Sequence, residues 1–357
     1  KMTDPKHFFK AALICAGLLT GSAAFAQDEV GGLVKSSPGD AMKLANAYLN
    51  PLFKGFGIGL NSGWNNSGRA KNTGRFELRV GFTGAFVPKA EESFDVTKLG
   101  LSNNVRPTNP SRTVSPTVAS SSPERVEMGI YDEAFLGGTV PVETFDLPDG
   151  ANIPFIPAPQ VQATVGLPKG IDVTLRAMPN VNIGDFGTIG MIGGGLKVDV
   201  LPLLMSKTAD RIMPVDLGLA VGYTQFSFEL PLEVNPPSGE PRDPDQRIEA
   251  KFSGVNVEAI LSKKLMFFTP FLSVGYNTAQ TDARMKGDYV FMTGATMTGQ
   301  PTYTTYTDPI SIKNSDIGGM RANAGFQLNL AVLRLYASYS VAQYNSFNAG
   351  IGIGIGK

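Results

Sequence analysis

Long stretches of alternating apolar and polar residues are the feature that most narrows the folds open to this chain. In the stretch 74–88 (GRFELRVGFTGAFVP), hydrophobic side chains occupy positions 76, 78, 80 and 82, and charged side chains occupy 75, 77 and 79. A period of two is the spacing of a β-strand. Similar alternation fills 170–179, 191–200, 320–330 and 332–341. Stretches of this length exceed the usual globular strand of about five or six residues and suit tilted strands that cross a bilayer.

The connections between these stretches favour a barrel. Short polar turns occur at 71–74, 167–170 and 261–264, whereas 101–123 and 231–247 are long and polar. Short turns at one end and long loops at the other are typical of bacterial outer-membrane barrels. The sequence therefore predicts an all-β fold, a transmembrane antiparallel up-and-down β-barrel of about 14 strands (range roughly 12–16), with a short N-terminal helix. A soluble periplasmic β-protein is the alternative.

The N-terminus predicts export. Residues 1–26 have a basic start, a short apolar core and an Ala24-Phe25-Ala26 cleavage site, as in a secretory signal peptide. The only cysteine and the only histidine, Cys15 and His7, lie within it. Cleavage therefore excludes disulfides, Ser-His-Asp triads and histidine metal sites from the mature protein. We expect no enzyme activity, cofactor or metal, and a location in the outer membrane of a Gram-negative bacterium.

The segment 27–54 predicts a short helix over 40–49, capped by Asp40 and ended by Pro51. The barrel is expected to occupy 55–357. In this arrangement the N-terminal segment is positioned to fold into the lumen as a plug.

Glycine alternates with hydrophobic residues at both expected ends of the barrel. The first strand is expected over 55–64 (GFGIGLNSGW) and the last over 347–357 (FNAGIGIGIGK). If these strands pair at closure, their glycines share the lumen face: Gly55, Gly57, Gly59, Gly350, Gly352 and Gly354. Three interpretations stay open, namely relief of crowding at the closure, a groove for the N-terminal segment, and a groove for an elongated apolar ligand.

Charged residues share the expected lumen face of the other strands. They are Arg75, Glu77, Arg79, Asp172, Arg176, Lys197, Asp199, Lys251, Arg321 and Arg334. Such residues could form a charged constriction that selects solutes, or cross-strand ion pairs that satisfy one another, and the mixture of signs favours ion pairs. Aromatic residues that could form interfacial girdles are Trp64, Phe82, Phe86, Tyr223, Phe226, Phe228, Phe267, Phe268, Tyr276 and Tyr339.

Three segments carry a family resemblance. YLNPLFKGFGIGLNSGWNN (48–66), LPKGIDVTLRAMPN (167–180) and MPVDLGLAVGYTQF (213–226) resemble an uncharacterised family of outer-membrane proteins from Bacteroidetes-type bacteria. The plan of a helix followed by a barrel is remotely similar to the FadL-like long-chain fatty acid transporter superfamily. That similarity implies a fourteen-stranded barrel, an N-terminal hatch and hydrophobic cargo.

These features predict a channel or carrier for small hydrophobic solutes with an N-terminal plug. The alternative is a structural or scaffold barrel with a closed lumen, whose long loops dock partners. The expected partners are outer-membrane lipid and a hydrophobic small molecule, with any protein partner left open. The chain carries 31 basic and 31 acidic residues, and this balance gives no electrostatic footprint for nucleic acid.

Overall fold

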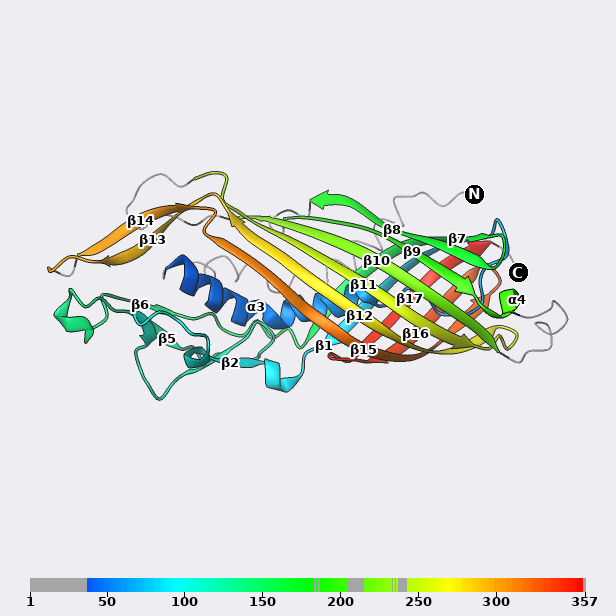
Figure 1. Cartoon of the computed structure of the whole chain (residues 1–357), viewed down its shortest axis with the longest axis horizontal. Coiled ribbons are helices and arrows are strands. Elements are labelled where there is room, and N and C mark those ends of the chain that lie inside the picture. The colour runs from blue at the N-terminus through cyan, green and yellow to red at the C-terminus, as the bar shows by residue number, and fades with distance from the viewer. Residues whose placement is uncertain are drawn as a thin grey trace.

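Ten strands pair edge to edge until the last meets the first, so the sheet closes into an antiparallel barrel (Figure 1). This computed structural model describes residues 37–182, 184, 187–204, 215–232, 234, 236, 243–298 and 300–355. The barrel strands are β1 (Phe76–Phe86), β7 (Phe155–Leu167), β8 (Ile171–Asn182), β9 (Thr188–Asp199), β10 (Asp216–Pro231), β11 (Arg247–Ser262), β12 (Phe268–Lys286), β15 (Ile310–Leu330), β16 (Leu333–Val341) and β17 (Ser346–Ile355). The predicted signal peptide, residues 1–26, lies outside the described residues.

The all-β barrel is confirmed, but the expected count of about 14 strands is not, because ten strands close the sheet. Two features of the sequence account for the difference. The stretch 55–64, expected to be the first strand, belongs to a helix up to Asn61. In addition, β12 and β15 are single strands of 19 and 21 residues, so long alternating stretches contribute fewer strands than their length suggests.

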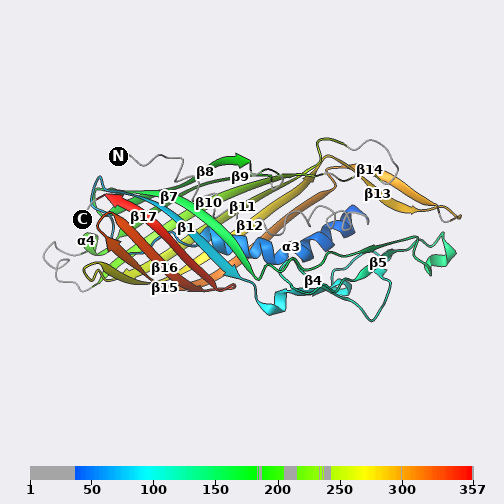
Figure 2. The same ribbon diagram turned by 180° about the vertical axis from the view of Figure 1, so that it is seen from behind.

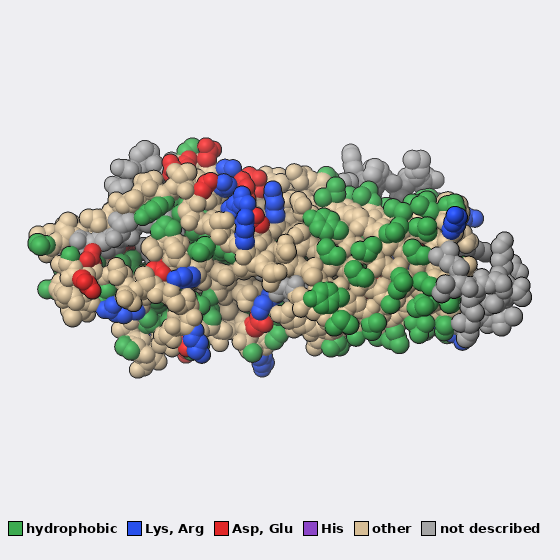
Figure 3. Space-filling model, viewed as in Figure 1, with side chains coloured by type: hydrophobic (Ala, Val, Ile, Leu, Met, Phe, Trp, Pro, Cys, Tyr) green, Lys and Arg blue, Asp and Glu red, His purple; other side chains and the backbone are tan. Residues whose placement is uncertain are grey.

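The outer surface of the barrel is apolar only near the short-turn end, where hydrophobic side chains form a continuous band in Figure 3. Exposed members of this band are Val173, Leu175, Ile192, Leu196, Leu219, Val221, Val257, Leu272, Val274, Ile351 and Ile353. Tyr223, Tyr276 and Tyr339 are also about half exposed on this surface. The expected girdle positions Trp64 and Phe226 are instead buried inside. A band of this kind is what the lipid-facing surface of a membrane barrel requires.

Towards the other end the pattern reverses, and the apolar side chains point inwards. Phe226, Phe252, Met285, Ile310 and Ile312 form part of one buried cluster there. The outer surface at this level carries charged groups instead (Figure 3), including the ion pair between Arg284 and Asp282. The strands therefore extend beyond the apolar band, and their inner face packs against another apolar element.

That element is the helix α3 (Pro38–Asn61), which runs along the inside of the sheet (Figure 2). Ser37 caps it and Pro38 occupies the first turn, so the predicted cap Asp40 lies within the first turn. Pro51 does not end the helix but lies inside it. The Phe56 ring stacks on the rings of Phe226 and Phe252 of the wall at 5.4 and 5.2 Å between centroids.

The long connections at the end away from the short turns form a separate folded layer. It contains β2 (Ser93–Asp95), β3 (Val105–Pro107), β4 (Val114–Pro116), β5 (Glu127–Ile130), β6 (Glu143–Asp146), and the 3-10 helices η1 (Lys89–Glu91), η2 (Val96–Lys98) and η3 (Leu136–Gly138). Leu44 and Tyr48 of α3 are buried among its apolar residues. A hairpin of β13 (Asp288–Ala295) and β14 (Pro301–Thr307) projects at the same end (Figure 1). At the short-turn end, α4 (Leu201–Leu204) follows β9.

Two glycines allow α3 to lie close against β7. A Cβ added at Gly55 would clash with the Ile156 side chain, and one added at Gly59 would clash with the Ala158 Cβ, which no rotamer change can move. A side chain at Gly39, in contrast, would meet nothing within 4 Å. The close approach explains why a helix with poor intrinsic propensity at these positions is kept.

We predict that Gly59→Ala lowers the stability of the folded barrel by about 1–3 kcal/mol, because the added methyl overpacks the interface with β7. Gly39→Ala in the same helix should be neutral or stabilising by up to about 1 kcal/mol. The stability of each variant is measured by the temperature at which its SDS-resistant folded form disappears on electrophoresis. Equal shifts for the two variants would contradict the close helix–wall contact.

Candidate functional site

The lumen is filled by the chain itself. After α3, residues 62–75, here called the lumen segment, continue inside the barrel to the start of β1. The Gly68 N–H donates to the Ser262 hydroxyl at 2.9 Å, and the Gly74 N–H donates to the Gly166 carbonyl at 2.8 Å. The segment thus reaches the short-turn end before the chain enters the wall.

Three arginines bind the junction between α3 and the lumen segment. Their bonds run from Arg79 to the carbonyls of Gly63 and Trp64, from Arg176 to those of Leu60 and Ser62, and from Arg321 to that of Asn61, all at 2.7–2.8 Å. The last carbonyls of a helix lack partners within the helix, and they form the negative end of its dipole. Guanidinium forks are well suited to such a cluster of acceptors.

Arg176 is fully buried and also lies over the Trp64 ring, with 3.8 Å between its Cζ and the ring centroid. The indole in turn occupies space left by two wall glycines. A Cβ at Gly195 would come within 2.6 Å of the ring, and one at Gly222 would clash with it. Gly195 in the middle of β9 and Gly222 of β10 therefore have a packing role.

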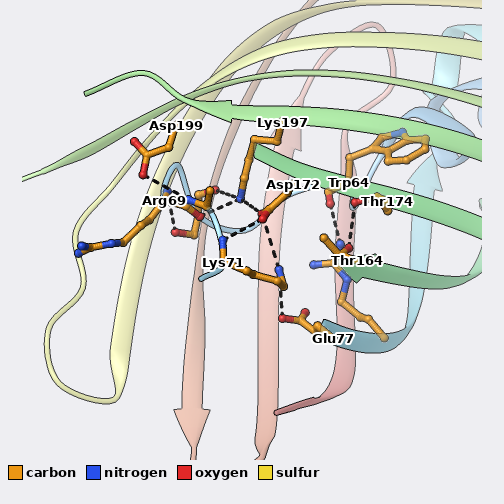
Figure 4. Close-up of polar contacts among 12 residues, drawn as sticks. Trp64, Arg69, Lys71, Glu77, Thr164, Asp172, Thr174, Lys197 and Asp199 are labelled. Atoms are coloured by element: carbon orange, nitrogen blue, oxygen red, sulfur yellow. Dashed lines mark hydrogen bonds and ion pairs between the residues drawn. The ribbon is translucent and has the colours of Figure 1, made fainter. Parts of the chain in front are cut away.

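A second polar cluster holds the lumen segment nearer the short turns (Figure 4). Lys197 donates to the carbonyls of Ser67 and Arg69 at 3.1 and 2.9 Å, and it pairs with Asp172 at 2.9 Å. Asp172 accepts a hydrogen bond from the Lys71 N–H at 2.8 Å. Asp199 accepts one from the backbone N–H of residue 70 at 3.3 Å. Charges from β8 and β9 thus bind backbone rather than only each other.

The other sequence-predicted charges divide between the inside and the outside. Glu77 is buried and pairs with Arg334 and with the Lys71 ammonium, the latter at 3.4 Å. Arg75 lies outside the strands, at the exposed mouth of the barrel before β1. Lys251 is exposed on the outer face of β11, contrary to its predicted lumen position. The even-numbered residues of β11 face inwards without interruption from Ala250 to Ser262, so Lys251 shares the outer face with Val255 and Val257.

The closing seam is formed by β1 and β17, with Gly352 opposite Arg79 and Gly354 opposite Glu77. The glycines of β17 alternate with outward-facing isoleucines. A Cβ at Gly350 would clash with the Tyr336 hydroxyl, and one at Gly354 would approach the Arg334 guanidinium to 2.6 Å. The glycines of this row therefore make room for the protein's own lumen side chains.

The predicted partner row of glycines is absent from the seam. Gly55, Gly57 and Gly59 lie in α3, so the expectation of a first strand over 55–64 is wrong. Sequence reasoning also missed the lumen segment, because Trp64 and the polar residues after it show neither strand nor helix periodicity. One signal in the sequence could have indicated the lumen segment, namely the excess of arginines on the lumen face. These arginines need more hydrogen-bond acceptors than the available carboxylates provide.

No helix in the described part of the chain has the length and apolar character needed to cross a bilayer. The described residues contain no group of three or more potential metal ligands.

A sequence family described as a family of unknown function (DUF6588) matches residues 5–355. No curated protein matches the sequence. Similar solved structures include the toluene transporter TodX of Pseudomonas putida, with 9% identity over 85% of this chain and 75% of that chain and a TM-score of 0.30. The NalP translocator domain of Neisseria meningitidis is also similar, with 9% identity over 90% of this chain and 98% of that chain and a TM-score of 0.29. Ail of Yersinia pestis has 9% identity over 79% of this chain and 98% of that chain, with a TM-score of 0.24. Scores this low carry no argument about function.

We predict that Arg176→Gln destabilises the folded barrel by about 3 kcal/mol or more, because three hydrogen bonds from a buried charged donor are lost, to the carbonyls of Leu60 and Ser62 and to the Gln162 side chain. Lys251→Gln, which removes an exposed charge, should change stability by less than about 0.5 kcal/mol.

The loss of the SDS-resistant form on heating measures stability, and hydrogen exchange of residues 60–66 measures release of the junction. Faster exchange is expected only in the Arg176 variant. If both variants behave alike, the arginine contacts do not hold the junction.

Proposed function

The chain belongs to the DUF6588 family of unknown function, and we propose that it is an outer-membrane barrel with a permanently filled lumen that displays a docking layer outside the cell. The observation that carries this proposal is the occupation of the lumen by α3 and the lumen segment, bound by arginines from β1, β8 and β15. The barrel serves in this proposal as an anchor, and the folded layer serves as the working surface.

Geometry supports a lumen without a passage. An α-helix with its side chains is about 10–12 Å wide, and a barrel of about eight strands is already filled by side chains alone. The ten strands here admit one helix and the side chains around it. Moving α3 would separate at least five carbonyls from their arginine donors. Transport through the centre is therefore costly.

The outer surface supports the membrane location and an orientation. The apolar band ends before the folded layer begins (Figure 3). In bacterial outer-membrane barrels the short turns face the periplasm and the long connections face outwards. The layer of β2–β6, together with the β13–β14 hairpin, is then the extracellular end.

Single cysteines test this placement. Met297 at the tip of the hairpin and Met266 in the β11–β12 turn are both highly exposed, at 90% and 86%. We predict that Met297→Cys reacts with a membrane-impermeant maleimide on intact cells, whereas Met266→Cys reacts only after the outer membrane is permeabilised. Reaction of both on intact cells, or of neither after permeabilisation, would overturn the orientation.

The docking role has a readout of its own, which uses position 297 again and a control position in the apolar band. A photo-crosslinker attached at Met297→Cys should yield protein adducts on intact cells, and one at Met320→Cys, exposed in the apolar band, should yield only lipid adducts. The refolded full chain should be silent in planar bilayers. A steady conductance would overturn the filled lumen, and the absence of protein adducts at position 297 would overturn the docking role.

One observation favours a second function, a carrier for small hydrophobic solutes. β7 pairs with β1 from Phe155 to Val165, but it pairs with β8 only from Gln162 to Leu167. Among the described residues, the wall is therefore unpaired between 155–161 of β7 and 177–182 of β8. Met178, at this gap, packs against the apolar cluster around α3.

The sequence itself prevents the gap from closing. Hydrogen bonds between β7 and β1 fall on even-numbered positions of β7, as the bond from Gly166 N–H to Arg75 O shows. Pro157 and Pro159 therefore direct their nitrogens towards β8, and proline has no N–H to donate. Such an unpaired edge beside an apolar interior would allow a small apolar molecule to pass sideways into the membrane.

A disulfide across the gap tests the carrier. The two cysteines replace Val161 and Ala177, which are the next positions in register beyond the last β7–β8 pair. Oxidation to the disulfide should abolish uptake of a hydrophobic fluorescent dye into proteoliposomes, and reduction should restore this uptake. Cysteines at Val165 and Val173, which are already paired, should leave uptake unchanged in both states. Uptake no faster than in empty liposomes would exclude the carrier.

A further inference from the structure

A cavity of about 340 Å³ lies at the short-turn end of the barrel, between the lumen segment and the wall. It lies at the opposite end from the folded layer and has no part in the docking role proposed above. Its walls come from the lumen segment and from the turn-proximal ends of β1, β7, β9, β10, β12, β15 and β16. Apart from Trp64 and Ala70, every described residue of the lining is polar or charged.

The charge of the lining is strongly one-sided. Among the described residues, seven lysine and arginine side chains line the cavity, and the only carboxylates in the lining are those of Glu77 and Asp216. Asp172, behind this lining, also pairs with Lys197 at 2.9 Å, so the excess of positive charge is 7 − 3 = 4. Both carboxylates already have cationic partners, since Glu77 pairs with Arg334 and Lys71, and Asp216 lies 3.6 Å from Arg69.

Two of the cations have no acidic partner. Arg75, before β1, and Lys264, in the β11–β12 turn, make no ion pair within 4 Å in the part of the chain that the structure describes. They lie at the two ends of the part of the wall formed by the consecutive strands β1, β17, β16, β15 and β12. Asn72, Gln327 and Asn329 add side-chain amides to the same lining.

We propose that this cavity binds a small anion that carries two or more carboxylate or phosphate groups. Guanidinium forks and lysine ammonium groups recognise these oxyanions through short charge-assisted hydrogen bonds. A cavity of this size is at the lower end of the range for small-molecule sites, and its polar walls exclude a largely apolar ligand. Because several cations converge, a multiply charged anion gains more than a single chloride does.

Only the compartment of the ligand depends on the proposed function, since the short turns of an outer-membrane barrel face the periplasm. The binding chemistry itself depends on the cavity alone. It can therefore be tested on the refolded full chain in detergent micelles, without reference to display or docking.

Calorimetric titration with citrate, with pyrophosphate and with the neutral triethyl ester of citrate tests the proposal. Citrate or pyrophosphate should bind in a saturable way, and the neutral ester should not. Binding of only one of the two anions identifies polycarboxylates or phosphates as the class. If neither anion binds more tightly than the ester, the proposal is wrong.

Two neighbouring lysines distinguish binding in this cavity from general electrostatic attraction of anions to the protein. Lys264→Gln should weaken anion binding about tenfold or more, because a charge-assisted contact is removed. Lys263→Gln, next in the chain but outside the lining, should weaken it less than twofold. Both variants should retain the SDS-resistant folded form. Equal weakening by the two would show diffuse attraction and overturn the site.

Discussion

The contact between three buried arginines and the carboxyl end of α3 is the interaction on which the rest of this architecture depends. A ten-stranded barrel has an interior that must be filled, and a helix placed there leaves its last carbonyls without partners. Arg79, Arg176 and Arg321 supply those partners from strands on different sides of the wall. Each guanidinium is itself costly to bury, and the carbonyls and the helix dipole offset that cost. Helix and arginines are therefore stable inside the barrel only together.

The same helix explains why hydrophobicity changes sides along the barrel. Near the short turns the wall is apolar outside and polar inside, where the lumen segment offers backbone groups. Beyond the apolar band, Phe226 and Phe252 face inwards because the Phe56 side of α3 needs an apolar surface. A single alternating strand such as β11 thus serves two environments. Its alternation of buried and exposed positions continues unbroken from Ala250 to Ser262, while the outer face changes from the charge of Lys251 to the apolar side chains of Val255 and Val257.

Much of the wall could be predicted from the sequence, because a period of two survives in almost every strand and fixes which residues share a face. Ile351 and Ile353 outside, with Gly352 between them facing the lumen, follow directly from that rule. The helix could not be predicted to its full length. In the stretch GFGIGL (55–60), two of the glycines whose alternation suggests a strand, Gly55 and Gly59, are required for close approach to Ile156 and Ala158, which lie about a hundred residues away in the chain. The partners of the lumen arginines are backbone carbonyls, and the pattern of side chains in a sequence does not predict which backbone carbonyls accept such bonds.

The two ends of the lumen segment differ in how their positive charge is used, and this difference connects the filled lumen with the cationic cavity. At the helix junction, the arginines are occupied by carbonyl oxygens at fixed distances, so that end is closed and rigid. At the mouth, Lys197 is occupied by Asp172 and by two carbonyls, but Arg75 and Lys264 have no acidic partner among the described residues. A barrel that needed only to neutralise its interior would place carboxylates beside these cations, as it does beside Arg334. Their omission at the solvent-facing mouth leaves a positive potential where a mobile anion can reach it.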